Sequence, residues 1–159
     1  MGSRVQRHLW VSAPVDRVWS GLADLTALVG WSADISHSVV ISDATSGVGA
    51  VRRVQVGRIA VLETVTVWEP GHALAYTVTG LPPAAGVVTT SWHLVTQGSG
   101  TDVTVTSTIE PLPGPPGRIV ARVLSRRLGR TDDELLRGLA RGAVADELSE
   151  SRNVAGIVR

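Results

Sequence analysis

The stretch GAVRRVQVGRIAVLETVTVWEPG, residues 49–71, decides the fold because it predicts two β-strands joined by a tight turn. Glycine followed by arginine at positions 57–58 suits a two-residue type II′ turn. This turn places Arg52 directly opposite Glu63 across the hairpin. Both residues then share a face with valines, while the other face carries polar side chains. A slip of one residue would turn the polar face inward, so the composition favours this register.

An arginine and a glutamate on an apolar face call for an explanation. Burying such a pair costs several kcal/mol per ion unless each charge is fully hydrogen-bonded, so stability alone is a weak reason to keep it. Two interpretations remain open from the sequence. Arg52 and Glu63 form either a purely structural pair or a pair that contacts a ligand.

Further strands are predicted on both sides of this hairpin by short β-rich runs between turn residues. The predicted strands are 4–12, 35–42, 49–57, 59–68, 73–79, 87–96 and 101–109. Connections this short favour antiparallel neighbours. A helix is expected at 13–24, with Pro14 in its first turn, and a second short helix ends near Gly30.

The C-terminal third changes to a helical pattern after the proline-rich segment 111–116. Apolar residues at three- and four-residue steps predict helices at 117–129 and 132–144, with a kink or restart at Gly129. The residues at these steps are Ile119, Val120, Val123, Leu124, Leu128, Leu135, Leu136 and Leu139. Residues 147–159 lack a convincing pattern and are expected to form a mobile tail. The prediction is one α+β domain, residues 1–146, with a curved sheet of about seven strands around the last helix.

The inward face of this sheet carries few polar groups. If the loop 69–72 pairs Trp68 with Ala73, Tyr76 lies beside Val65 and points inward. If the turn 97–100 pairs Thr96 with Thr101, an apolar face that includes Thr90, Trp92 and Ser107 also points inward. His37 could point inward in line with Ile35, Val39 and Ile41, although a surface or core histidine is the favoured interpretation. A mostly apolar surface with sparse polar groups is typical of a ligand pocket.

Composition excludes several classes of function. The 159 residues suit one domain, and the absence of cysteine excludes disulfides and thiolate metal sites. The four histidines, His8, His37, His72 and His93, show no metal-ligand spacing, so no metal and no cofactor are expected. Neither a signal peptide nor a membrane span is evident, and the expected location is the cytoplasm. The chain is expected to be a monomer or homodimer.

Arginines recur along one face of the C-terminal helical segment, at Arg118, Arg122 and Arg126. The favoured interpretation is a solvated helix face. An anionic head group, a membrane surface or nucleic acid are the alternatives. A net charge of +1 and the scarcity of neighbouring aromatic residues argue against nucleic acid.

The ordered motifs together resemble the polyketide cyclase/dehydrase-like branch of the START/Bet v 1-like superfamily, also called SRPBCC or helix-grip. They are SAPVDRVWSGLAD, GWSADI with Trp31, GVGAVRRV with Arg52, VLETVTVWEPGHALAYTVTG with Glu63 and Tyr76, and GSGTDVTVTSTIEP. The resemblance spans about residues 4–144. It implies a helix-grip fold with an apolar cavity under the C-terminal helix. The superfamily includes aromatase/cyclases as well as lipid and hormone binders.

We therefore expect a mostly apolar ligand, such as a polyketide, an aromatic compound or a lipid. The expected ligand-binding residues are Arg52, Glu63, Val65, Tyr76, Thr90, Trp92, Ser107, Trp31, Val120 and Leu124. If the protein is an enzyme, it catalyses cyclisation, aromatisation or dehydration without a cofactor, with Glu63 and Arg52 as catalytic residues. The alternative is a non-catalytic carrier, sensor or regulatory protein. The absence of histidine among the better-placed inward residues favours that alternative modestly.

Overall fold

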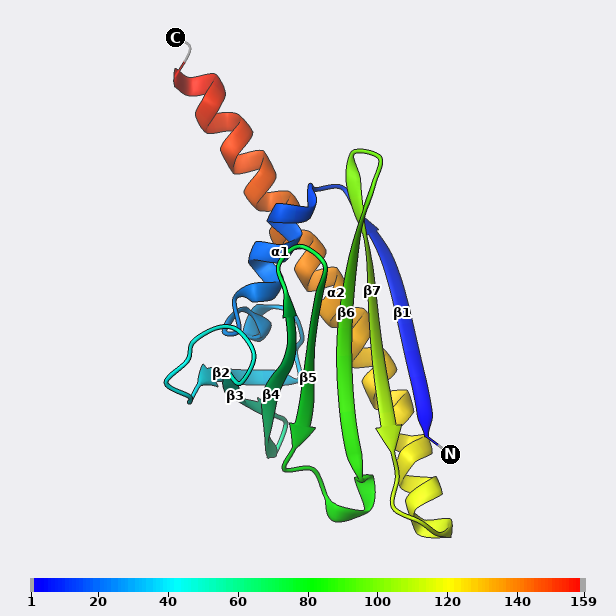
Figure 1. Cartoon of the computed structure of the whole chain (residues 1–159). Helices are drawn as coiled ribbons and strands as arrows, with labels where there is room; N and C mark the ends of the chain where they lie inside the picture. The colour runs from blue at the N-terminus through cyan, green and yellow to red at the C-terminus, as the bar shows by residue number, and fades with distance from the viewer. Residues whose placement is uncertain (1, 158–159) are drawn as a thin grey trace.

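A computed structural model describes residues 2–157 and places a seven-stranded antiparallel sheet against one long helix (Figure 1). The strands are β1 (Ser3–Val11), β2 (Ile35–Val40), β3 (Val51–Val56), β4 (Ile59–Glu69), β5 (Ala73–Thr79), β6 (Val87–Gln97) and β7 (Gly100–Glu110). Their order in the sheet is β1-β7-β6-β5-β4-β3-β2. Consecutive strands from β2 to β7 are therefore paired, and β7 also pairs with β1. The predicted helix-grip α+β fold is confirmed.

The helical segments cover one face of the sheet. They are α1 (Val15–Ala23), the 3₁₀ turns η1 (Ala27–Gly30) and η2 (Pro83–Ala85), and α2 (Pro115–Ile157). Inward side chains of the sheet and of α1 pack against Leu135, Leu136 and Leu139 of α2. The helix and the sheet thus enclose a common apolar interior, because each has one apolar face that needs a cover.

The β3–β4 hairpin has the predicted register, with Arg52 opposite Glu63. Gly57 has a φ of 57°, and no residue other than glycine has a positive φ among the described residues. A positive φ at the first turn position alone distinguishes type II′ from type I′. The two-residue turn therefore sets which side chains of β3 and β4 point inward.

A bulge in β4 corrects the predicted pairing at the next loop. Val65 pairs with Tyr76 as expected, but the register shifts by one residue before Val67, so Trp68 pairs with Leu74 and not with Ala73. The extra residue of a bulge reverses the inward and outward alternation beyond it. Trp68 consequently turns inward and packs edge-to-face on Trp19, with ring centroids 5.3 Å apart.

A second bulge, in β2, corrects the predicted inward row at this edge of the sheet. The register shifts between Ile35 and His37, so Ile35 is buried while His37 is exposed. Val39 and Ile41 are also exposed, at 50% and 53%. His37 is therefore a surface residue, which agrees with the favoured interpretation, and the alternative that it points inward in line with Val39 and Ile41 is wrong, because the bulge turns these residues outward.

Helix α2 is continuous through Gly129, where the sequence predicts a kink or restart. Gly129 is buried against β1, and a Cβ atom at this position would lie 2.6 Å from Nη2 of Arg7. The glycine therefore permits the close approach of β1 to α2 and does not end the helix. β1 forms one edge of the sheet, and α2 contacts it more extensively than any other strand.

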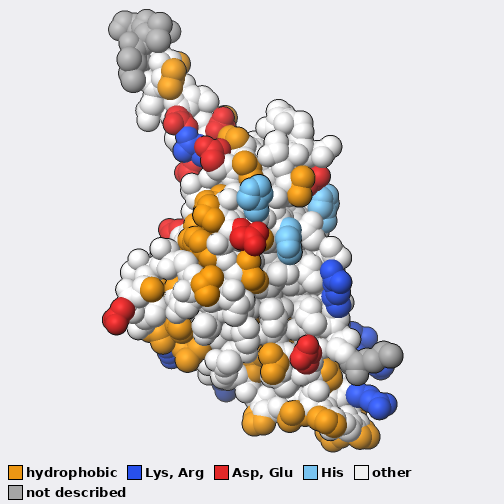
Figure 2. All heavy atoms as spheres, in the orientation of Figure 1, with side chains coloured by type: hydrophobic (Ala, Val, Ile, Leu, Met, Phe, Trp, Pro, Cys, Tyr) orange, Lys and Arg blue, Asp and Glu red, His pale blue; other side chains and the backbone are white. Residues whose placement is uncertain are grey.

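The helix also continues into the segment expected to be a tail. It is helical as far as Ile157, and Arg17 of α1 forms ion pairs with Glu147 and Glu150 on this part of α2. Figure 2 shows this end standing clear of the body, with charged side chains of both signs at its base. Its mobility stays a prediction, and residues 158–159 lie outside the described residues. No helix within residues 2–157 is long and apolar enough to cross a membrane.

Candidate functional site

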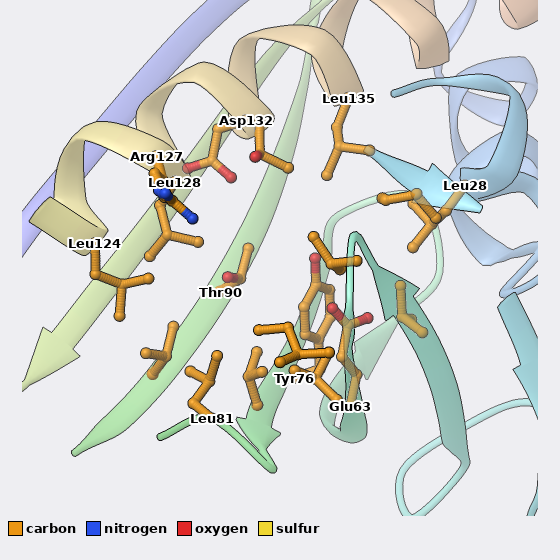
Figure 3. Close-up of a pocket in the computed structure, with 18 residues that line it drawn as sticks. Leu28, Glu63, Tyr76, Leu81, Thr90, Leu124, Arg127, Leu128, Asp132 and Leu135 are labelled. Carbon is orange, nitrogen blue, oxygen red and sulfur yellow. The ribbon is translucent and has the colours of Figure 1, made fainter. Parts of the chain in front are cut away.

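A cavity of about 160 Å³ lies between the sheet and α2 (Figure 3). Most of its lining side chains are Val, Leu or Ile. They are Leu28, Ile35, Val54, Val56, Ile59, Val61, Val78, Leu81, Val88, Leu124, Leu128 and Leu135. The other lining residues are Glu63, Tyr76, Thr90, Arg127, Thr131 and Asp132. An apolar wall with a few polar groups can enclose an apolar molecule and fix its orientation.

Glu63 faces the cavity from β4 and is bound from behind by Arg52. Nε of Arg52 donates to Oε2 of Glu63 at 2.5 Å, and Nη1 donates to the carbonyl oxygen of Leu25 at 3.2 Å. The guanidinium carbon also lies 4.9 Å from the centre of the Tyr76 ring. Arg52 is only 4% exposed and is absent from the cavity wall. It therefore holds Glu63 and a backbone carbonyl in place without facing the cavity itself.

The charge on this arginine is stabilised by its neighbours. Burial disfavours the charged form and is the largest single effect, but Glu63 and Tyr76 together outweigh it, and the pKa of Arg52 is raised above its ordinary value. Hydrogen bonds between a guanidinium and a carboxylate are among the stronger ones in proteins. The pair thus places one negative group at the wall of an apolar cavity.

Tyr76 lines the same wall, and the buried Trp92 supports it. The indole Nε1 of Trp92 lies 3.5 Å from the Tyr76 hydroxyl and donates to it. Burial, more than the nearby Glu63, raises the pKa of Tyr76 well above its ordinary value, so the phenol keeps its proton. The hydroxyl can therefore donate a hydrogen bond to an oxygen of a ligand.

Asp132 reaches the cavity from α2 and was not predicted from the sequence. Its side chain is 2% exposed, and Oδ2 has no hydrogen-bond partner among the described residues. Figure 3 shows it directed toward the cavity from the helix, across from Tyr76 and Glu63 on the strands. A buried polar atom without a partner is rare in proteins and calls for a functional explanation.

The pKa of Asp132 is raised from its ordinary value of 3.8 to about 6. Burial is the main cause, and Asp133 adds to the shift by repulsion. The hydroxyl of Ser107 on β7 and the charge of Arg7 on β1 act in the opposite direction. Arg7 also has another partner, because its Nε donates a hydrogen bond to Oδ2 of Asp133 at 3.2 Å. Asp132 can therefore exchange a proton near neutral pH.

A signal for Asp132 does exist in the sequence. It follows Leu128 by four residues and precedes Leu135 by three, so it falls on the apolar stripe of the helix. An acid on such a stripe is as unexpected as the arginine and glutamate on the valine face of the hairpin. The same reasoning that selected Arg52 and Glu63 could have found it.

The residues predicted for the site separate into three groups. Glu63, Tyr76, Thr90 and Leu124 line the cavity. Arg52, Trp92 and Ser107 are buried directly behind that wall, where Ser107 shares a 3.0 Å hydrogen bond with Thr90. Trp31, Val65 and Val120 are absent from the wall.

Two of these last residues have identifiable packing partners. Val65 belongs to a separate cluster with Leu25 and Ala50, so the prediction that it borders the cavity is wrong. Trp31 packs against Gly138 of α2, where a Cβ atom would lie 2.6 Å from its Cα.

A second, wider hollow adjoins the cavity, and we call it the vestibule. Its volume is about 590 Å³, and it is lined by Asp34, Val56, Gly57, Arg58, Ile59, Arg127, Arg130 and Thr131. Four of these residues, Val56, Ile59, Arg127 and Thr131, also line the cavity. Within residues 2–157, no group of three His, Asp or Glu side chains is placed to hold a metal ion.

The sequence over residues 4–144 matches the family described as "Polyketide cyclase / dehydrase and lipid transport". The chain belongs to this family. The match covers both the hairpin with Arg52 and Glu63 and the part of α2 that carries Asp132. A search among proteins of curated function finds no match.

Solved structures show the polyketide cyclase/dehydrase fold over nearly the whole chain. The Zhui aromatase/cyclase from Streptomyces sp. R1128 superposes with a TM-score of 0.76 at 18% identity, covering 90% of this chain and 94% of that one. The di-domain aromatase/cyclase StfQ from the steffimycin biosynthetic pathway also gives 0.76, at 15% identity. That superposition covers 92% of this chain and 52% of StfQ, so this chain spans about half of StfQ.

A third similar structure is Ara h 8.0201, with a TM-score of 0.70 at 14% identity. It covers 91% of this chain and 99% of that one. At these identities the likeness establishes the fold, and the chemistry must be argued from the site.

Proposed function

We propose that this member of the polyketide cyclase/dehydrase family binds a mostly apolar carbonyl compound in the cavity and moves protons on it without a cofactor. The observation that carries the proposal is Asp132, whose unpartnered carboxyl oxygen belongs to a mostly apolar wall. A ligand with a hydroxyl or carbonyl group would supply the missing hydrogen bond. The reactions that suit such a site are cyclisation, aromatisation and dehydration of a polyketide-like substrate.

The two carboxyl groups of the cavity differ in the way this chemistry requires. In a dehydration, a carboxylate takes a proton from the carbon next to a carbonyl group, and a carboxylic acid gives a proton to the hydroxyl that leaves as water. Glu63 is paired with Arg52 and supplies the carboxylate. Asp132, with its raised pKa, supplies the acid. Arg52 acts through Glu63, since it does not reach the cavity.

The size of the cavity limits the substrate. A cavity of about 150 Å³ accommodates a benzene-sized molecule in other proteins, so about 160 Å³ holds roughly one ring or a short chain. A larger polyketide would therefore place one reacting ring in the cavity and the remainder in the vestibule. This arrangement would hold the reacting atoms close to Glu63 and Asp132.

The alternative function is a carrier that encloses the ligand and changes nothing. The mostly apolar wall favours it, because such a wall suits simple burial of a ligand. Both functions predict binding, and only the first predicts proton exchange with the bound molecule. An experiment that measures both quantities on one compound separates them.

A suitable compound is 2-tetralone, whose hydrogens next to the carbonyl group exchange with deuterated water. We expect the protein to bind 2-tetralone and to accelerate this exchange, as measured by proton NMR. Asp132→Asn and Glu63→Gln are each expected to lower the exchange rate by about 100-fold while binding is retained. Asp146→Asn, on an exposed position of the same helix, is the matched control.

Each outcome bears on the proposal. Binding of 2-tetralone with exchange no faster than in buffer would reject catalysis and leave the carrier. Exchange that survives Asp132→Asn at the full rate would remove Asp132 from the reaction. A failure of 2-tetralone to bind, tested by isothermal titration calorimetry at millimolar concentration, would count against both functions.

A further inference from the structure

We propose that the natural ligand of the cavity carries an anionic group, a carboxylate or a phosphate, and that the vestibule holds this group through Arg58, Arg127 and Arg130. The inference rests on the proposed function, because it concerns the same ligand. It adds a chemical class to that ligand, namely an apolar body with a negative end.

The first observation is the charge of the vestibule wall. Three arginines and one acid, Asp34, line it. Among the described residues, none of these four groups forms an ion pair or a side-chain hydrogen bond within the chain. A hollow lined by an excess of one charge concentrates ions of the opposite charge. Guanidinium groups also bind carboxylates and phosphates through paired hydrogen bonds.

The second observation is that local structure positions these arginines on two sides of the hollow. Arg58 sits at the tip of the β3–β4 hairpin, and the amide of Gly57 donates to the carbonyl oxygen of Asp34 at 3.0 Å. The hairpin tip is thereby fixed to the segment before β2. Arg127 and Arg130 are three residues apart on α2, so they are neighbours on its surface.

The third observation is the continuity of the vestibule with the cavity. Val56 and Ile59 line both spaces, and they give the ligand an apolar surface from one to the other. Arg127 also lines both, so a charge lies where the apolar wall ends. A ligand too large for about 160 Å³ must extend past this arginine into the vestibule. A negative group at that end meets cations, whereas an apolar end would have to desolvate them.

A matched pair of probes tests the inference by isothermal titration calorimetry. The probes are 1-naphthylacetate and 1-naphthylacetamide, which share the apolar body and differ in charge. We expect the acetate to bind about five- to tenfold more tightly, the effect of two or three exposed ion pairs. This preference is expected to shrink as salt is raised.

Variants of the vestibule then assign the preference to its arginines. The double variant Arg58→Gln, Arg130→Gln leaves the cavity wall intact, because neither residue lines the cavity. It is expected to reduce the preference for the acetate to about twofold or less, since only Arg127 remains, while the affinity for the amide stays the same. The control is Arg118→Gln, Arg122→Gln, which removes the same charge from another part of α2 and should keep the preference.

The outcomes distinguish this inference from the proposed function. If both probes bind equally well, or if the control variant loses the preference too, the anionic group is rejected and the cavity remains a binding site. If neither probe binds, the proposed function fails and the inference fails with it. A third probe, 1-naphthyl phosphate, separates the two sources of charge. Tighter binding than the acetate indicates a phosphate ligand, and weaker binding indicates a carboxylate.

Discussion

Glu63 and Asp132 line the same cavity from opposite walls, and of these two carboxyl groups only Glu63 forms an ion pair with a described residue. One carboxyl group is therefore paired with a buried arginine, while the other has a pKa raised to about 6. Two acids with different environments can divide the tasks of base and acid. This relationship also governs how the stability of the protein should depend on pH.

Stability should fall as pH rises past the pKa of Asp132. The pKa is higher in the folded protein than the ordinary value of 3.8, so the folded state binds the proton more tightly. This contribution is full below about pH 4 and is lost as pH rises through about 6, amounting to roughly 2–3 kcal/mol. Ser107, Arg7 and Asp133 contribute to the pKa of Asp132, and the charge of Asp132 contributes in turn to the raised pKa of Tyr76.

The variant Asp132→Asn isolates that contribution because it stays neutral at every pH. Relative to the wild-type protein, it should gain roughly 2–3 kcal/mol in free energy of unfolding between pH 4 and pH 7.5. Urea denaturation at a series of pH values measures the difference. A stability difference that does not change with pH would show that Asp132 titrates normally in the folded protein.

Replacing only one residue of the Arg52–Glu63 pair should lower the free energy of unfolding more than replacing both residues. Either Arg52→Met or Glu63→Leu leaves one buried charge without its partner, and each is expected to lower the free energy of unfolding by about 3–5 kcal/mol. The double variant should lose less than the sum of the two, because no unpaired charge remains. Urea denaturation of all four proteins gives the coupling energy. Additive losses would mean that the two groups stabilise the fold independently.

Filling the cavity should weaken binding at little cost in stability. Val78 lines the cavity and is only partly buried, so Val78→Phe places the larger ring into open space. We expect affinity for 1-naphthylacetamide to fall about tenfold or more, with a change in stability below about 1.5 kcal/mol. The matched control is Val65→Phe, in the packed cluster with Leu25 and Ala50. It should destabilise the fold by about 1–3 kcal/mol.

Gly138 and Gly142, one turn apart on α2, should respond to alanine in opposite ways. At Gly138 a Cβ atom would lie 2.6 Å from the Cα of Trp31, so Gly138→Ala must push η1 away and should destabilise the protein by about 1–3 kcal/mol. At Gly142 no atom lies within 4 Å of such a Cβ. Gly142→Ala should therefore stabilise the helix by about 0.5–1 kcal/mol. Thermal unfolding compares both, and equal effects would argue against the close contact with Trp31.

Most of the fold follows from local sequence signals. The Gly57–Arg58 turn determines the register of β3 and β4, since side chains alternate with a period of two. The bulges in β2 and β4 could not be predicted this way, because a bulge depends on how neighbouring strands fit. Gly129 shows the same limit. Its effect on α2 depends on the approach of β1, more than a hundred residues earlier in the chain.

The site was predictable only in part. The inward position of Arg52 and Glu63 followed from the hairpin register, but which of the two faces the cavity depends on packing against Leu25 and Tyr76. Asp132 left a visible signal on the apolar stripe of the helix. The sequence gives no comparable signal for the vestibule, because Arg58 and Arg127 come together only when the sheet and α2 are assembled.

The layer behind the cavity wall has a consequence for how this protein can diversify. Arg52 joins β3, β4 and the segment before η1 through one buried guanidinium, so a change there is felt in three parts of the chain. The valines and leucines of the wall have no such ties, and apolar residues of similar volume can replace one another at small cost. Descendants of this sequence can therefore acquire new ligands by exchanging wall residues, while the charged residues behind the wall are inherited unchanged.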